Sequence, residues 1–221
     1  MKYAALFLIL GASLTWLSRT GSELAILALW PAACCVAVAL SYLFCSPAIF
    51  GKSQTGRLNP ISVVLLLPYL TFTWLTWHLL RVVSTENALD RLDDRTIIGR
   101  RLLASEFPTD VENVIDLTAE FVEPRRVVAN TNYIAFPILD ASIVSTAELT
   151  AMVSKIDQLQ GTTYIHCAQG HGRTGLLTVA LLIHRDPNLT VDQAIHELQR
   201  VRPALTCNRT QTETLRKWQS A

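Results

Sequence analysis

The chain has 221 residues, half of them hydrophobic, and this length suits one or two domains. Its charges are uneven: residues 1–80 carry five charged side chains, whereas residues 81–221 carry 15 Lys and Arg and 17 Asp and Glu. The second part has a net charge of −2 and lacks the basic excess that neutralises phosphate backbones, so we expect no nucleic acid partner.

Three apolar stretches occupy the first part, at Tyr3–Leu17, Leu24–Phe44 and Ile61–Leu80. A helix needs roughly 20 apolar residues to cross a bilayer, so the second and third stretches are predicted transmembrane helices. The first is shorter and begins like a signal peptide, but no clear small-x-small cleavage site follows it, so we favour a short span over a cleaved or interfacial segment. Residues 1–80 are therefore predicted to form a transmembrane region of two or three helices in the lipid bilayer.

The basic residues around these stretches predict an orientation. With three spans, Arg19 lies on the same side as the arginines between positions 81 and 101, whereas Lys2, Lys52 and Arg57 lie on the other. Because Lys and Arg favour the cytoplasmic side, we expect an integral membrane protein whose C-terminal domain is cytoplasmic. The five cysteines show neither metal-ligand nor disulfide spacing, and a reduced thiol suits the same compartment.

Residues 81–95 are polar and are predicted to form a juxtamembrane linker or short helix, followed by a soluble α/β domain at 96–221. Short β-type runs predict strands at 96–98, 114–117, 133–136 and 162–166.

Helices are predicted between and after these strands. Capping boxes at Ser145–Glu148 and Thr190–Gln193 each open an amphipathic helix, the first ending at Gly161 and the second before Pro203. A further helix is predicted from about Arg173 to His184, and Asn208 is predicted to cap the last helix through Trp218.

The stretch Ile165–Gly175 joins a short buried strand, a glycine-containing turn and a helix start. Backbone N–H groups in such a turn and at a helix N-terminus form a cradle for an anion. The helix dipole and the guanidinium of Arg173 would favour the thiolate of Cys167, which could then attack a bound phosphate.

This pattern, His166-Cys167 followed five residues later by Arg173-Thr174, resembles the signature of cysteine-dependent phosphatases. Residues from about 96 to 218 resemble the compact dual-specificity branch, here as a membrane-anchored bacterial-type member. The resemblance implies an α/β fold, a dual-specificity-phosphatase-like domain with a central sheet flanked by helices, preceded by an α-helical transmembrane region. It also implies phosphomonoester hydrolysis through a cysteinyl-phosphate, with no metal and no organic cofactor.

The resemblance gives each signature residue a role beside a plainer alternative. Cys167 would be the nucleophile rather than a buried structural cysteine, and Arg173 would clamp the phosphate oxygens rather than lie solvated at a helix start. His166 would order the loop and the thiolate. Thr174 would donate a hydrogen bond to the sulfur, or else bond its own backbone. The phosphate-binding loop comprises Ala168, Gln169, Gly170, His171, Gly172 and Arg173.

The general acid of the family is an aspartate that precedes the signature, and Asp140, 27 residues before Cys167, matches that spacing. Its alternative role is that of a turn residue. We interpret Asp116 as a structural strand-end residue and favour a simple spacer role for His171 over substrate contact. Gln211 could position the hydrolytic water, but we favour a helix-surface position next to the cap.

Two substrate classes follow from the resemblance. The default is a phosphoprotein carrying phosphorylated Tyr, Ser or Thr, and the alternative is a membrane phospholipid such as phosphatidylglycerophosphate. The loop has no Lys or Arg at its variable positions, which argues against polyphosphorylated headgroups. A second alternative is a non-catalytic phosphate-binding adaptor, which the complete set of Cys, Arg and Asp disfavours.

Overall fold

A computed structural model describes residues 2–19 and 23–220. The chain divides into two compact units. The helical unit comprises Met1–Ser53, Arg57–Ser84 and Ala119–Val122. The α/β unit comprises Gln54–Gly56, Thr85–Thr118 and Glu123–Ala221.

The helical unit contains three α-helices and two short 3-10 helices among its described residues. They are α1 (Lys2–Leu17), η1 (Glu23–Ala28), α2 (Leu29–Leu43), η2 (Pro47–Phe50) and α3 (Pro60–Val83). Pro60 starts α3, where its missing N–H costs no hydrogen bond, and the Asn59 side chain accepts the N–H of Ile61 at 2.9 Å. Two segments, Ala25–Leu43 and Pro60–Val83, are long and apolar enough to cross a membrane, whereas α1 is shorter.

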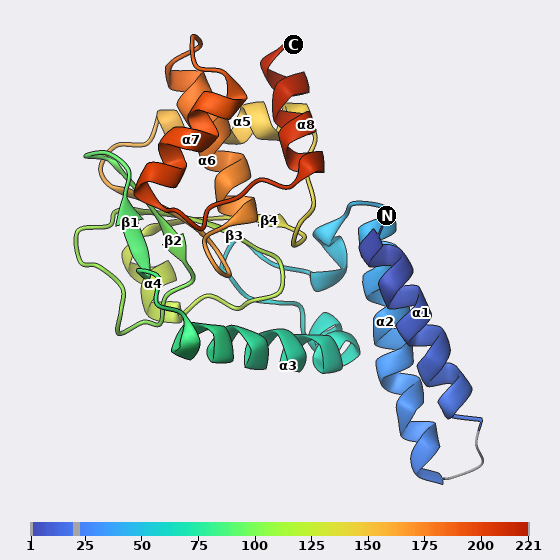
Figure 1. The fold of residues 1–221 in the computed structure, drawn as a ribbon. Coiled ribbons are helices and arrows are strands. Elements are labelled where there is room, and N and C mark those ends of the chain that lie inside the picture. The colour runs from blue at the N-terminus through green and yellow to red at the C-terminus, as the bar shows by residue number, and fades with distance from the viewer. Residues whose placement is uncertain (1, 20–22, 221) are drawn as a thin grey trace. The chain divides into compact units, whose positions relative to one another are not determined.

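Small residues let α1 and α2 pack closely side by side (Figure 1). A Cβ atom on Gly11 would lie 3.3 Å from the carbonyl oxygen of Ala32, so a larger side chain there would push the helices apart. The indole N–H of Trp30 in α2 donates to the carbonyl of Val64 in α3 at 3.1 Å. Every exposed large apolar side chain in the described part of the chain lies in this unit.

The α/β unit is built on a five-stranded sheet of order β1-β2-β5-β3-β4, in which β1 is antiparallel to β2 and the other pairs are parallel. Strand β5 is central, so the loop that follows it leaves the middle of the sheet at the carboxyl edge. The strands are β1 (Leu89–Arg91), β2 (Thr96–Arg100), β3 (Asn113–Thr118), β4 (Asn132–Ile138) and β5 (Thr163–Cys167).

Alternating side chains bury both faces of this sheet. Ile98, Ile115 and Ile165 lie side by side on one face, and their core includes residues of the four helices gathered there (Figure 1). The opposite face carries Tyr164, which packs in a smaller core with Val127 of α4 (Arg125–Asn130). The four helices are α5 (Thr146–Asp157), α6 (Gly172–Arg185), α7 (Val191–Val201) and α8 (Arg209–Gln219).

The α/β fold, the four predicted strands and the predicted helices are confirmed, and the side chains of Ser145, Thr190 and Asn208 each cap their helix. One boundary differs, because α5 ends at Asp157 and Gly161 lies in the turn beyond it with φ +76°.

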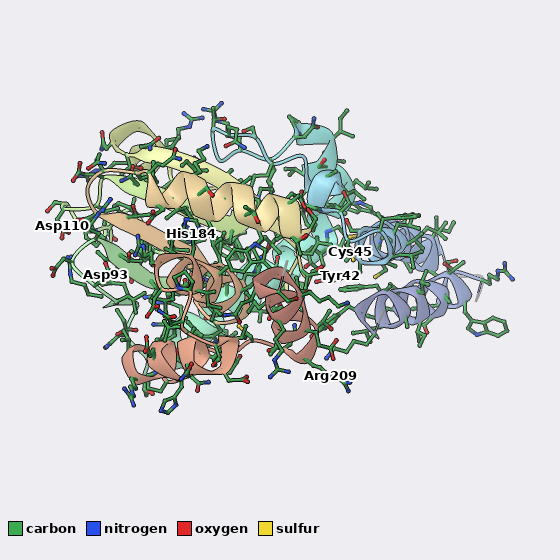
Figure 2. The ribbon with its side chains drawn as sticks, turned by 90° about the horizontal axis from the view of Figure 1, so that it is seen from above. Tyr42, Cys45, Asp93, Asp110, His184 and Arg209 are labelled. Atoms are coloured by element: carbon green, nitrogen blue, oxygen red, sulfur yellow. The ribbon has the colours of Figure 1, made fainter. Side chains whose placement is uncertain are left out.

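The segment 81–95 departs from the prediction of a linker. Helix α3 continues to Val83, and residues 89–91 form β1 at the edge of the sheet. Asp93, labelled in Figure 2, then accepts a hydrogen bond from Arg185 of α6 at 3.1 Å. A three-residue strand with one apolar side chain has no periodicity, so only its pairing with β2 reveals it.

We expect Leu181→Ala to destabilise the α/β unit by about 2–5 kcal/mol, because this α6 side chain is fully buried in the larger core and its removal leaves a cavity. Leu182→Ala is the matched control, since Leu182 is only partly buried on the same helix. The free energy of unfolding of both variants is measured by denaturant titration of the full chain in detergent. Proteolysis reports the fraction unfolded at each denaturant concentration. Equal losses in the two variants would contradict this packing.

Candidate active site

Cys167 is the last residue of the central strand β5 and is 3% exposed. Its sulfur accepts the N–H of Gly170 at 3.3 Å, so the loop folds back over the thiol before α6 begins at Gly172. Gly170 has φ +74°, and a Cβ atom there would lie 2.4 Å from the carbonyl carbon of Gly99 in β2. Only glycine fits this turn, which brings the N–H of Gly170 to the sulfur two residues before α6 begins.

Arg173 lies in the first turn of α6 and is 2% exposed. Its Nη1 donates to the carbonyl of Ile138 at 3.1 Å, and its Nη2 lies 3.4 Å from Oδ1 of Asp140. The structure therefore brings the predicted acid and the predicted phosphate clamp together at the carboxyl edge of the sheet. The Asp140 side chain is 66% exposed, so it faces the solvent from which a substrate would arrive.

The loop after Asp140 is held by the N-terminus of α8. The Asn208 amide donates to the carbonyl of Ala141 at 2.9 Å, and the Gln211 amide donates to that of Ser142 at 3.0 Å. Ala141 has φ +54°, a conformation that a non-glycine residue keeps only when its surroundings enforce it. These two hydrogen bonds hold the backbone around Ala141 in this conformation.

The prediction that Gln211 lies on the helix surface is wrong, because the side chain is fully buried. Its oxygen accepts the N–H of Asn208 in the capping box, while its nitrogen faces the acid loop. A capping pattern predicts the first contact only, since the second depends on a segment about 70 residues earlier.

Two other signature residues, His166 and Thr174, are fully buried. His166 lies with Nδ1 3.4 Å from the carbonyl oxygen of Cys167, and its ring stacks on that of Tyr164 with centroids 5.3 Å apart. The hydroxyl of Thr174 has no hydrogen-bond partner among the described residues. The alternative in which the Thr174 hydroxyl bonds its own backbone is therefore not what the structure shows.

Asp116 has the structural role that its strand-end position predicts. One carboxylate oxygen accepts the N–H and the hydroxyl of Thr118 at 2.8 and 2.7 Å, and the other accepts the hydroxyl of Tyr133 at 2.7 Å. Burial, together with the charge of Asp116, raises the pKa of Tyr133 well above its ordinary value, so this hydroxyl remains a donor.

Asp116 also belongs to a buried cluster with Glu123 and His166, whose potential ligand atoms lie within 4.8 Å of one another. Glu123 lies 3.5 Å from the guanidinium of Arg101, and Asp116 is engaged as described above. Protein groups thus compensate both carboxylates, which makes the cluster a buried structural network that includes a residue of β5.

Sequence reasoning missed two residues around the loop. Glu86 lies 2.7 Å from the ring Nε2 of His171, so His171 has a protein partner, and its spacer role toward substrate stays a prediction. Arg202, 2% exposed, donates to the carbonyls of Gly170 at 2.9 Å and Gln169 at 3.1 Å. The one local signal for Arg202 was its place directly before Pro203, and an exposed arginine at the end of a surface helix would give the same pattern.

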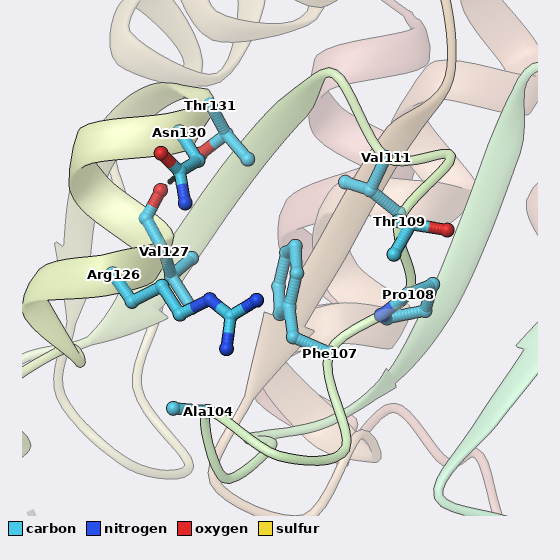
Figure 3. Close-up of a pocket in the computed structure, with 9 residues that line it drawn as sticks. All are labelled: Ala104, Phe107, Pro108, Thr109, Val111, Arg126, Val127, Asn130 and Thr131. Atoms are coloured by element: carbon cyan, nitrogen blue, oxygen red, sulfur yellow. Dashed lines mark hydrogen bonds between the residues drawn. The ribbon is translucent and has the colours of Figure 1, made fainter.

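A cavity of about 180 Å³ lies elsewhere in the α/β unit, between Phe107, Val111, Val127 and Arg126 (Figure 3). Val111 precedes β3 and Thr131 precedes β4, so this cavity lies at the amino edge of the parallel strands. Cys167 ends β5 at the opposite edge, and the cavity contributes nothing to its surroundings.

We expect Gly170→Ala to cost about 1–3 kcal/mol in backbone strain alone and to disorder the loop, because the alanine Cβ would meet the backbone of β2. Gly172→Ala is the comparison, since the nearest atoms to its Cβ would lie 3.5 Å away. The thermal unfolding midpoint of each variant measures the effect, and a larger drop for Gly172→Ala would contradict this geometry.

We also expect Cys207 to resist alkylation in the folded protein, because burial raises the pKa of its thiol to about 12. At pH 7 almost no thiolate is present, and reactivity should rise only as the pH approaches that value. Peptide mass spectrometry after brief treatment with iodoacetamide measures this. Modification of Cys207 at pH 7 before unfolding would show that the thiol is not buried.

Comparison with known proteins agrees with this geometry. The family model described as the dual specificity phosphatase catalytic domain matches residues 106–221, more than half of the chain. No curated protein sequence matches the chain.

Three solved structures illustrate the fold similarity. PTPMT1 in complex with PI(5)P is 17% identical with a TM-score of 0.54, and the match covers 61% of this chain and 96% of that one. Tk-PTP in its active form is 22% identical with a TM-score of 0.53, covering 60% and 97%. The human tyrosine phosphatase-like serine/threonine/tyrosine-interacting protein is 16% identical with a TM-score of 0.53, covering 60% and 95%.

At these identities the solved structures show a shared fold, and the family assignment rests on the model match. With Cys167 seated under the loop and Arg173 buried beside it, the chain belongs to the dual-specificity phosphatase family and is a cysteine-dependent phosphatase.

Proposed function

We propose that the chain hydrolyses phosphomonoesters in two steps, with Cys167 as nucleophile, Arg173 as phosphate clamp and Asp140 as general acid and base. One observation carries the proposal: the sulfur of Cys167 accepts the Gly170 N–H at 3.3 Å in a turn that ends at a helix N-terminus. An anion bound in that turn lies directly against the nucleophile.

In the first step the thiolate attacks phosphorus, and the bond from phosphorus to the substrate oxygen breaks. Asp140, as the carboxylic acid, gives its proton to the leaving oxygen and becomes a carboxylate. Arg173 binds two nonbridging oxygens through its planar fork, which lysine does not match. An arriving phosphate competes with Asp140 for this guanidinium, whose Nη2 lies 3.4 Å from the carboxylate.

In the second step water attacks the cysteinyl-phosphate, and the Asp140 carboxylate accepts its proton. The sulfur–phosphorus bond breaks, the thiolate leaves and inorganic phosphate is released. The buried hydroxyl of Thr174, which has no partner in the described part of the chain, can donate to the departing sulfur. His166 and the remaining loop residues hold the backbone that carries the thiolate.

We propose a phosphoprotein substrate carrying phosphorylated Tyr, Ser or Thr. The variable positions of the loop carry no Lys or Arg: they are Ala168, Gln169 and His171. His171 lies 2.7 Å from Glu86, whose carboxylate also pairs with Arg202 at 3.3 Å. Such surroundings suit one phosphate group better than a polyphosphorylated headgroup.

A phospholipid substrate is the second candidate, favoured by the helical unit. Two of its helices are long and apolar enough to cross a membrane, and it carries all the exposed large apolar side chains of the described residues. We propose an integral membrane protein with a cytoplasmic catalytic unit, which gives a lipid monoester such as phosphatidylglycerophosphate access to the site. The solved PTPMT1 structure holds PI(5)P, a lipid phosphate.

We expect Cys167→Ser to lower kcat by at least about 10³-fold, because an alcohol lacks the thiolate's nucleophilicity at neutral pH. Cys207→Ser, which replaces a partly buried thiol outside the loop, should keep wild-type turnover. Asp140→Ala should release a stoichiometric burst of p-nitrophenol from p-nitrophenyl phosphate, since loss of the base slows hydrolysis of the cysteinyl-phosphate.

The full chain in detergent-solubilised and vesicle-reconstituted form is compared on phosphopeptides and on vesicles containing phosphatidylglycerophosphate. A larger kcat/KM on peptides supports the protein substrate, and the reverse assigns the lipid. Undiminished turnover by Cys167→Ser would refute the proposed chemistry. A wild-type protein that binds phosphate without any turnover would identify a phosphate-binding adaptor.

A further inference from the structure

Three consecutive carbonyl groups of the phosphate-binding loop are held from outside the loop. The carbonyl of Ala168 accepts the backbone N–H of Arg101 at 3.2 Å. The carbonyls of Gln169 and Gly170 accept Nη2 and Nε of Arg202, at 3.1 and 2.9 Å. One buried guanidinium therefore fixes two neighbouring peptide groups.

The direction of these carbonyls sets the direction of the loop's donors. In a trans peptide the C=O and the N–H of the same plane point to opposite sides, and the peptide bonds of this loop are trans. The peptide plane between Gln169 and Gly170 shows this. Its carbonyl, from Gln169, faces Arg202, and its N–H, from Gly170, points to the sulfur of Cys167 at 3.3 Å. The next plane, whose carbonyl also faces Arg202, carries the N–H of His171.

Arg202 is itself held by the segment before β2. Its Nη1 donates to a carboxylate oxygen of Asp90 at 2.7 Å and to the carbonyl of Asn87 at 3.0 Å. Its Nη2 lies 3.3 Å from a carboxylate oxygen of Glu86. With the two loop carbonyls, these contacts occupy all five N–H donors of the guanidinium, so its orientation is fixed by both sides.

We propose that Arg202 is a positioning residue, which turns the amides of Gly170 and His171 toward the bound phosphate, and that Glu86, Asn87 and Asp90 hold it in place. The inference rests on the proposed function, since it gives the loop amides a phosphate to bind. The three supporting residues precede the matched segment 106–221, so the loop depends on chain outside the family model. Lysine would keep the charge but lose the fork that reaches two carbonyls.

The test uses the full chain in detergent with Arg202→Lys and Arg202→Gln. We expect the inhibition constant of inorganic phosphate, measured against p-nitrophenyl phosphate, to rise on the order of tenfold or more, because misdirected amides bind the anion poorly. The pH midpoint for carboxymethylation of Cys167 by iodoacetate should move upward, since the Gly170 N–H no longer stabilises the thiolate. Arg202→Lys should lose less than Arg202→Gln.

Arg185→Gln is the matched control, because Arg185 also links α6 to two carboxylates, Asp93 and Asp157, each at 3.1 Å. It touches no loop carbonyl, so it should lower the unfolding midpoint without moving the carboxymethylation midpoint or the phosphate inhibition constant. These two readouts separate positioning from a general loss of stability.

In folded Arg202→Lys, a phosphate inhibition constant within twofold of wild type together with an unchanged pH midpoint of carboxymethylation would overturn the proposal. If the Arg202 variants do not fold, Asp90→Asn decides it, because this change keeps the guanidinium but removes the ion pair at 2.7 Å. Wild-type readouts in folded Asp90→Asn then overturn the proposal. Failure of the proposed function is a separate result, seen as turnover that does not require Cys167.

Discussion

Backbone N–H groups converge on an anion only when the carbonyls of the same peptide planes point away from it, and buried carbonyls need donors of their own. In this protein the backbone of Arg101 and the side chain of Arg202 supply those donors for three successive residues of the loop. The phosphate-binding loop is thus surrounded by residues that hold its carbonyls. These residues follow β2 and α7, and the segment around Glu86 supports them.

The same arrangement explains why the site lies where it does in the fold. Strand β5 is central in the sheet, so the loop that leaves its carboxyl end has β2 on one side and β3 on the other. β2 supplies the surface on which Gly170 packs, and the strand beyond β3, β4, leads directly to Asp140. Cys167, Arg173 and Asp140, the proposed nucleophile, clamp and acid, come together because parallel strands end at one edge.

The sequence predicted what local patterns encode. The strands, the capping boxes and the loop from Cys167 to Arg173 follow from residues within a few positions of one another, and the structure has them. Arg202, Gln211 and β1 were not predictable in this way. Arg202 meets Asp90 across 112 residues, and Gln211 meets Ser142 across 69. In each case the local pattern fits an ordinary surface position, and only the fold brings in the distant partner.

The capping box of α8 joins two tasks in one turn of helix. Asn208 and Gln211 satisfy the first N–H groups of the helix and, with their remaining amide hydrogens, clasp the backbone that follows Asp140. A shortened protein ending near Thr206 would keep Cys167, Arg173 and Asp140, the residues proposed to perform the chemistry, but would lose both hydrogen bonds that hold the backbone after Asp140. A stable form of the proposed site therefore includes α8, although this helix follows Arg173 by more than 30 residues.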